Sequence, residues 1–258
     1  MSEAVLTQTL NFFWSIDITL DKMKFFGWEP LLEERKIRSV IGTLWTKVGN
    51  YFVTTNASVL MPSMIKFALS HNLHITVSLD GDQETTEENR KTFSGKSLYS
   101  LSLKNSMQAS EYLRVNQVIT SKTAHKVYDN FLFLYNMWFR KFNFLPEYYR
   151  EWSKEWLKDL ICGIWKIKTY IQKHPISLIN AENYSPMSFF NIGIVVDTDG
   201  SIYGTNLILS GDFESHKESL KVGNVYTGLK KNILDESFCI EYMDIIQWII
   251  KETYRSEE

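Results

Sequence analysis

The strongest constraint on the fold is the stretch LHITVSLDGDQETTEENR, residues 73–90, which changes character at its centre. Apolar and β-branched residues alternate over residues 74–79, a pattern typical of a strand. The strand ends at Asp80-Gly81, and we expect the acidic segment that follows to be a solvated loop. A strand that ends by presenting Ser78, Asp80 and a glycine is typical of parallel α/β proteins, whose sites form at the carboxyl ends of strands.

Three further segments share this design, namely KFFGWEP, YFVTTNAS and KFNFLPEYY. In each of them an apolar strand ends in polar, glycine or proline residues before a helical pattern begins. The expected strands are 23–26, 51–55, 74–79, 112–120 and 141–145, and the expected helices are 4–16, 31–48, 61–70, 97–109, 123–138 and 152–172. This order predicts a row of βα units with one functional edge.

The pattern changes near residue 176. Strands are expected at 192–196 and 201–209 around an Asp-Gly turn, which is typical of a hairpin. A third strand at 220–225 and a helix at 233–254 follow. We interpret Asp197 and Asp199 as turn-forming residues rather than metal ligands. The sequence therefore predicts an α/β domain over residues 1–175 and a small α+β appendage over residues 176–258.

Composition and charge exclude several classes of protein. With 258 residues, of which 44% are hydrophobic, the chain can bury a core and is not expected to be disordered. The net charge of −2, with both signs spread along the chain, argues against a nucleic-acid partner. No apolar run approaches the roughly 20 residues that span a bilayer, and the N-terminus lacks a signal-peptide pattern. We therefore expect a cytoplasmic protein that binds no membrane.

The sequence contains two cysteines, Cys162 and Cys239. Zinc and iron–sulfur sites usually take three or four protein ligands, so these residues cannot form one unaided. Both cysteines are expected to be buried as small apolar residues. The histidines show no metal-ligand spacing. We therefore assign no metal ligand and no catalytic residue.

Six segments, in order, resemble the radical S-adenosylmethionine (AdoMet) enzymes that carry a C-terminal SPASM-type extension. They are FFGWEPLLEE, YFVTTNASVL, HITVSLDGDQETTEENR, VNQVIT, FNFLPEYYREWS and VVDTDGSIYGTNLILS. The colinear order of these short motifs carries the resemblance over nearly the whole chain. Such enzymes mature ribosomal peptides or make protein-derived cofactors. The resemblance implies a partial (βα) barrel over residues 1–175 and a SPASM-like extension over residues 176–258.

The resemblance also implies which residues bind the cofactor. The matching positions are Gly27, Glu29, Thr55, Asn56, Ser78, Asp80 and Asn116, with Asn143 at a polar position on the following strand. In the family, the segment that Gly27 and Glu29 match meets the amino group of AdoMet, and a carboxylate suits an ammonium ion. Trp28 replaces the second glycine of that segment, and its indole could fill the methionine pocket.

Other roles remain open for the two carboxylates. Glu29 could stabilise the N-terminus of the helix that begins at Leu31. Asp80 could simply form the Asp-Gly turn.

The sequence departs from the family in its cysteines. The CxxxCxxC motif, which supplies three cluster ligands, lies in the family before the segment that residues 4–26 match, and it is absent here together with the first βα unit. Thr205 stands where the family has an auxiliary-cluster cysteine. The ligands of the expected [4Fe-4S] clusters are therefore absent, and AdoMet remains a possible cofactor.

Two functions follow from this resemblance. In the first, the chain is a cluster-less accessory protein in ribosomal peptide or protein-cofactor maturation. Its open strand edge would bind a precursor peptide or a complete radical SAM enzyme. In the second, the chain is a fragment or split subunit of a radical SAM peptide-modifying enzyme, and a missing N-terminal segment supplies the cluster.

Overall fold

The computed structural model describes residues 1–16, 19–90, 97–147, 151–182, 192–209, 211–230 and 242–249. The chain forms two compact units, one of residues 19–184 and one that combines residues 1–18 with residues 185–258. Helix α1 (Glu3–Ser15) is thus grouped with the C-terminal residues. The expected division into domains 1–175 and 176–258 remains a prediction.

The larger unit is built on a six-stranded sheet with the order β1-β2-β3-β4-β5-β6. Its strands are β1 (Leu20–Phe25), β2 (Val48–Thr55), β3 (Leu73–Ser78), β4 (Arg114–Ile119), β5 (Lys141–Pro146) and β6 (Ser177–Leu178). Each neighbouring pair is parallel. The predicted α/β class with a parallel sheet is therefore confirmed. Strand β6 was missed because two residues are too few to show a periodic pattern.

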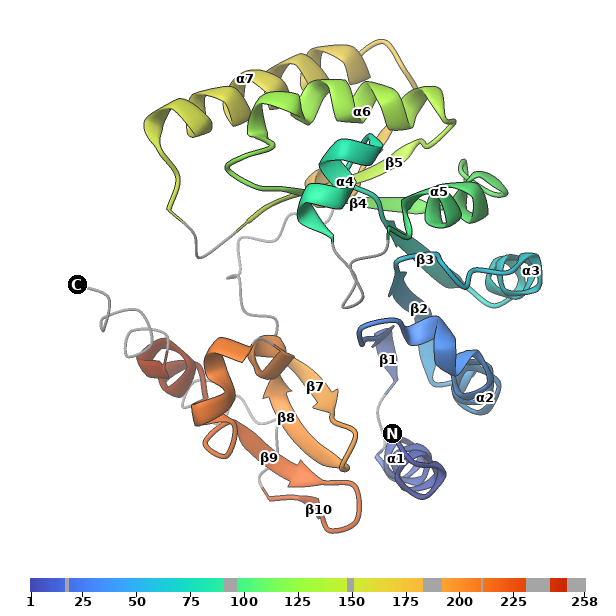
Figure 1. Ribbon diagram of the computed structural model, residues 1–258. Coiled ribbons are helices and arrows are strands. Elements are labelled where there is room, and N and C mark those ends of the chain that lie inside the picture. The colour runs from blue at the N-terminus through green and yellow to red at the C-terminus, as the bar shows by residue number, and fades with distance from the viewer. Residues whose placement is uncertain are drawn as a thin grey trace. The chain divides into compact units, whose positions relative to one another are not determined.

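Helices cover one face of this sheet (Figure 1). The helices of the unit are α2 (Glu34–Leu44), α3 (Pro62–Ser70), α4 (Gln83–Asn89), α5 (Tyr99–Met107), α6 (Val127–Asn136), α7 (Lys154–Ile171) and α8 (Ile179–Glu182). Side chains alternate between the faces of a strand, and Val53, Val77 and Val115 are fully buried on the same face of the sheet. The residues between them on these strands therefore point to the opposite face.

The acidic segment after β3 is a helix, so the prediction of a loop there was wrong. Asp82 caps α4, because its carboxylate accepts a hydrogen bond of 2.8 Å from the Thr85 amide. The preceding residue, Gly81, has a φ of +147°, and a Cβ there would lie 2.1 Å from Cγ of Asn130. A local cap and a glycine turn therefore form a helix from residues that carry no apolar stripe.

The smaller unit contains an antiparallel sheet with the order β10-β9-β8-β7. Its strands are β7 (Ile192–Val196), β8 (Ser201–Thr205), β9 (Lys221–Asn224) and β10 (Gly228–Leu229). The predicted hairpin is confirmed, and Asp199 forms the turn by accepting a 2.8 Å hydrogen bond from the Ser201 amide. Strand β8 ends at Thr205, earlier than expected, and a 3-10 helix follows over Asn206–Leu209.

Tyr242 fastens the helix at residues 242–249 to this sheet. Its hydroxyl donates to the Leu220 carbonyl at 2.6 Å and accepts from the Gly204 amide at 3.1 Å. Burial raises the pKa of Tyr242 to about 12, so the hydroxyl keeps its proton at neutral pH.

Among the described residues, none of the helices has the length and apolar character that crossing a membrane requires.

Candidate functional site

Glu29 joins the end of β1 to the end of β2. Its carboxylate accepts hydrogen bonds from the Thr55 hydroxyl at 2.8 and 2.9 Å and from the Asn56 amide at 2.8 Å. It also accepts a 3.0 Å bond from the Leu31 amide, at the start of a 3-10 helix over Pro30–Glu33. The capping role left open for Glu29 is therefore present, and the same contacts bring together three of the predicted site residues.

The turn after β2 is held by the side chains that touch Glu29. The Thr55 hydroxyl also accepts from the Ala57 amide at 2.8 Å, and the Asn56 side chain accepts from the Ser58 amide at 2.8 Å. Ala57 has a φ of +63°, in the left-handed region that favours glycine. The turn therefore keeps a glycine-type backbone although an alanine occupies the position.

Asp80 lies at the end of β3 and is fully buried. Arg90 pairs with it in a bidentate manner, with two hydrogen bonds of 2.8 Å. The Val118 amide donates to the same carboxylate at 2.8 Å, and the Asn89 side chain donates at 3.2 Å. The carboxylate thus connects the end of α4 to β4, a role beyond the simple turn that was considered. Sequence reasoning missed Arg90, although it closes the quoted motif ten residues later.

A row of polar side chains crosses the middle of the sheet. Ser78 is the register partner of Asn116, which in turn is the register partner of Asn143, so all three point to the same face. Asn143 donates to the Asn116 side-chain oxygen at 2.9 Å. Within the described residues, the Ser78 hydroxyl and the Asn116 side-chain nitrogen have no hydrogen-bond partner. We name Ser78, Asn116 and Asn143 the polar row.

The polar row lies level with the site around Glu29. Thr55 and Val77 are register partners, and Asn56 and Ser78 are the residues that follow them on β2 and β3. The side chains of Glu29, Asn56 and the polar row are half-buried, whereas those of Thr55 and Val77 are buried. The carboxyl half of the sheet thus offers amide and hydroxyl groups that a polar ligand could share.

Positive charges lie nearer the amino ends of the same strands. Arg114 donates to Nδ1 of His74 at 3.3 Å, so the ring proton is on Nε2, which lies 3.3 Å from the Asn50 side-chain oxygen. Burial lowers the pKa of His74, and the charges of Arg114 and Lys141 lower it further. His74 is therefore neutral at pH 7, and the charge here comes from Arg114 and Lys141.

Gly27 and Trp28 follow β1 and form an open part of the rim, by which we mean the edge of the sheet at the carboxyl ends of its strands. Trp28 is 91% exposed, so its indole does not fill a buried pocket, contrary to the suggestion from sequence. Nothing lies within 4 Å of the position that a Cβ of Gly27 would take. The rim beside Glu29 therefore has room for a ligand atom.

The cysteine predictions have different outcomes. Cys162 is exposed on α7, so the expectation that it is buried was wrong, because only Gly163 and Ile167 of this helix are buried. Cys239 lies outside the described residues. Thr205 is buried, and its hydroxyl accepts from the Leu207 amide at 3.3 Å.

Comparison with known proteins identifies solved structures with a similar fold. No protein-family model and no curated protein matches the sequence. Among solved structures, the histidine-tagged form of anSMEcpe with bound AdoMet matches with a TM-score of 0.75 at 17% identity, over 94% of this chain and 70% of that chain. Native anSMEcpe with bound AdoMet and the Kp18Cys peptide matches with a TM-score of 0.73 at 16% identity, over 94% and 74% of the two chains.

These structures are of an anaerobic sulfatase-maturating enzyme of the radical SAM/SPASM class. The resemblance inferred from the motifs is therefore confirmed for the fold. At this level of identity the likeness shows the fold alone.

Proposed function

We propose that this chain is an accessory protein of ribosomal peptide or protein-cofactor maturation that binds a peptide at the open edge of its parallel sheet. In this proposal residues 1–175 form a partial (βα) barrel, and residues 176–258 form a SPASM-like extension. The observation that carries the proposal is the position of β1 at the end of the six-stranded sheet that the described residues form.

Strand β1 pairs with β2 and ends the order of the six-stranded sheet. Asp21, Lys22 and Lys24 are exposed along it. An edge strand has a row of backbone N–H and C=O groups that another chain can pair with, and peptides commonly bind by adding a strand. Two of the matching structures contain a bound peptide, Kp18Cys in one and Cp18Cys in the other, which supports a peptide as the partner here.

The carboxyl ends of the strands would bind AdoMet beside that edge. Gly27, Asn56, Ser78 and Asn116 are the proposed contact residues, because their groups are half-buried or open. Thr55, Glu29 and Asp80 are proposed as positioning residues, since their polar atoms are already hydrogen-bonded to the protein. The matching structures contain bound AdoMet, which supports this choice of ligand.

An iron–sulfur cluster does not fit the residues described. Such a cluster is held by cysteine thiolates, usually four, and the sequence has two cysteines. The described ranges contain no group of three or more His, Cys, Asp or Glu residues placed to hold a metal ion. Any cluster chemistry would therefore use ligands from another polypeptide segment, as in the alternative of a split enzyme subunit, and we assign this chain no step of it.

Hydrogen–deuterium exchange tests the peptide-binding role. Peptides would be selected from a display library against the immobilised chain, and exchange would be measured with and without the best binder. The Leu20 amide already donates to the Lys47 carbonyl, and in a parallel pair only alternate amides of β1 face away from β2. We expect these outward-facing amides within residues 20–25 to exchange at least tenfold more slowly in the complex, because strand addition supplies their missing partners. Protection confined to other segments, or no selected binder, would contradict the proposal.

A further inference from the structure

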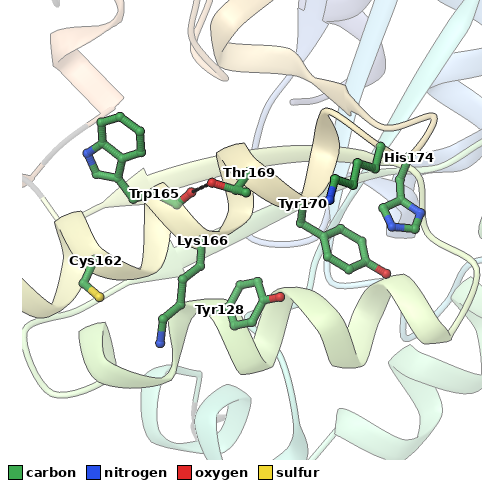
Figure 2. A pocket seen from close by; sticks show the side chains of 8 residues that line it. Tyr128, Cys162, Trp165, Lys166, Thr169, Tyr170 and His174 are labelled. Carbon is green, nitrogen blue, oxygen red and sulfur yellow. Dashed lines mark hydrogen bonds between the residues drawn. The ribbon is translucent and has the colours of Figure 1, made fainter.

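A groove between α6 and α7 is a second candidate for binding, separate from the strand ends. It has a volume of about 450 Å³, within the range of roughly 300–1,000 Å³ in which small ligands bind. Figure 2 shows Tyr128 on α6 facing Lys166 and Tyr170 of α7, with His174 beyond the end of that helix. Among the residues that the structure describes, no acidic side chain lines the groove.

The aromatic rings of the groove are held in place by one another. The His174 ring stacks on Tyr170 with 4.0 Å between centroids, and the Tyr135 hydroxyl lies 3.3 Å from Nδ1 of His174. The Tyr170 and Phe131 rings meet edge to face at 5.7 Å. Such locked rings form a rigid surface that needs little ordering when a partner binds.

The charges around these rings are positive. The Lys166 ammonium lies 5.8 Å from the centroid of Tyr128, and the Lys168 ammonium lies 5.2 Å from that of Trp165. Lys173 also lines the groove. In the part of the chain that the structure describes, none of these three lysines forms an ion pair with a carboxylate. Their charge is thus available to a negatively charged partner.

An apolar stripe on α7 continues the groove. Leu157, Ile161 and Trp165 recur at a spacing of four, and they are 41%, 58% and 61% exposed. Residues at this spacing share one face of a helix. An exposed apolar stripe beside unpaired lysines is typical of a surface that binds another protein.

We propose that this surface docks an acidic peptide segment of a partner protein, with one apolar side chain seated against Tyr128 and Trp165. The carboxylates of the segment would pair with Lys166 and Lys173. This inference goes beyond the proposed function, because the groove lies on the helical layer and involves none of the strand-end residues.

Fluorescence anisotropy with a labelled probe tests this docking. The probe is a short glutamate-rich peptide with one central leucine, and the comparison peptide carries glutamine in place of glutamate. We expect the acidic probe to bind, the neutral one to bind at least tenfold more weakly, and added salt to weaken the complex. Lys166→Glu combined with Lys173→Glu is expected to weaken binding about tenfold or more, and Trp165→Ala about fivefold.

A matched pair of changes on other helices controls for long-range charge. Lys66→Glu on α3 combined with Lys104→Glu on α5 makes the same change in net charge at exposed positions away from the groove and from the α7 stripe, and binding should change less than twofold. The bound probe should also slow the reaction of Cys162 with a thiol reagent, and Cys162→Ser removes that signal without affecting Cys239. Strand-end binding of AdoMet should be unchanged in all these variants.

Several outcomes would overturn the inference. They are no binding of the acidic probe, equal losses in the groove and control variants, and an unchanged reaction rate of Cys162. Tighter binding of a single-stranded oligonucleotide of the same charge would assign the groove to nucleic acid instead.

Discussion

Replacing Asp80 with alanine is expected to lower the free energy of unfolding by about 3–5 kcal/mol, because it leaves a partly buried cation without its partner. The carboxylate is fully buried, and Arg90, whose side chain is 32% exposed, contacts both of its oxygens. The Val118 amide would also lose its acceptor. Since Arg90 can still reach water, we expect a loss near the lower end of this range.

Urea denaturation followed by circular dichroism measures this loss. Asp80→Asn should lose less, since it keeps the shape of the side chain and one acceptor oxygen. Glu84→Ala is the matched control, because it removes the same charge nearby from a side chain that is 82% exposed and paired with Lys126. Exposed pairs contribute about 0–1 kcal/mol. Equal losses in Asp80→Ala and Glu84→Ala would contradict the structural role of Asp80.

Replacing Phe131 with alanine is expected to cost about 3–5 kcal/mol, because it empties the centre of an aromatic cluster between α6, α7 and the sheet. Phe131 is fully buried. Its ring meets Phe142 edge to face at 5.0 Å and lies 6.2 Å from the Phe144 ring. No neighbouring side chain can fill the space without leaving its own packed position.

Thermal and urea unfolding of three variants would check this expectation. Phe131→Leu should lose less than half as much as Phe131→Ala, because most of the volume stays filled. Phe133→Ala on the same helix provides the control, since its side chain is only half-buried. If Phe133→Ala proved as destabilising as Phe131→Ala, the cluster around Phe131 would not be the centre of this core.

The order of strands and helices in the larger unit could be predicted because each strand ends in residues that stop it. Residues 74–79 alternate, and Asp80-Gly81 follows at once, so the strand boundary lay within one residue of β3. Helix α4 could not be predicted in this way. Its first turn is held by the Asp82 cap and by the close packing of Gly81 on the Asn130 side chain. Neither contact produces an apolar periodicity in the sequence.

The resemblance to radical SAM enzymes indicated the residue types of the candidate site, which stay a prediction, but not their contacts. It placed Glu29, Thr55 and Asn56 at one cofactor site, whereas their hydrogen bonds depend on the exact turn after β1. The alignment of Ser78 with Asn116 depends on strand register, which a single sequence does not show. Likewise, the exposure of Cys162 depends on which face of α7 packs against α6.

The most direct test of the strand-end site is calorimetric titration of the folded chain with AdoMet. We predict saturable binding with one site per chain, weakened at least tenfold in Asn116→Leu and several-fold in Ser78→Ala, both of which should keep the native circular dichroism spectrum. Cys162→Ser, on the exposed surface of α7, should bind as the unchanged chain does. Two results would contradict the proposal that the strand ends bind AdoMet. One is the absence of saturable heat up to about 1 mM AdoMet, a dissociation constant that corresponds to a binding free energy of roughly −4 kcal/mol. The other is unchanged binding in Asn116→Leu.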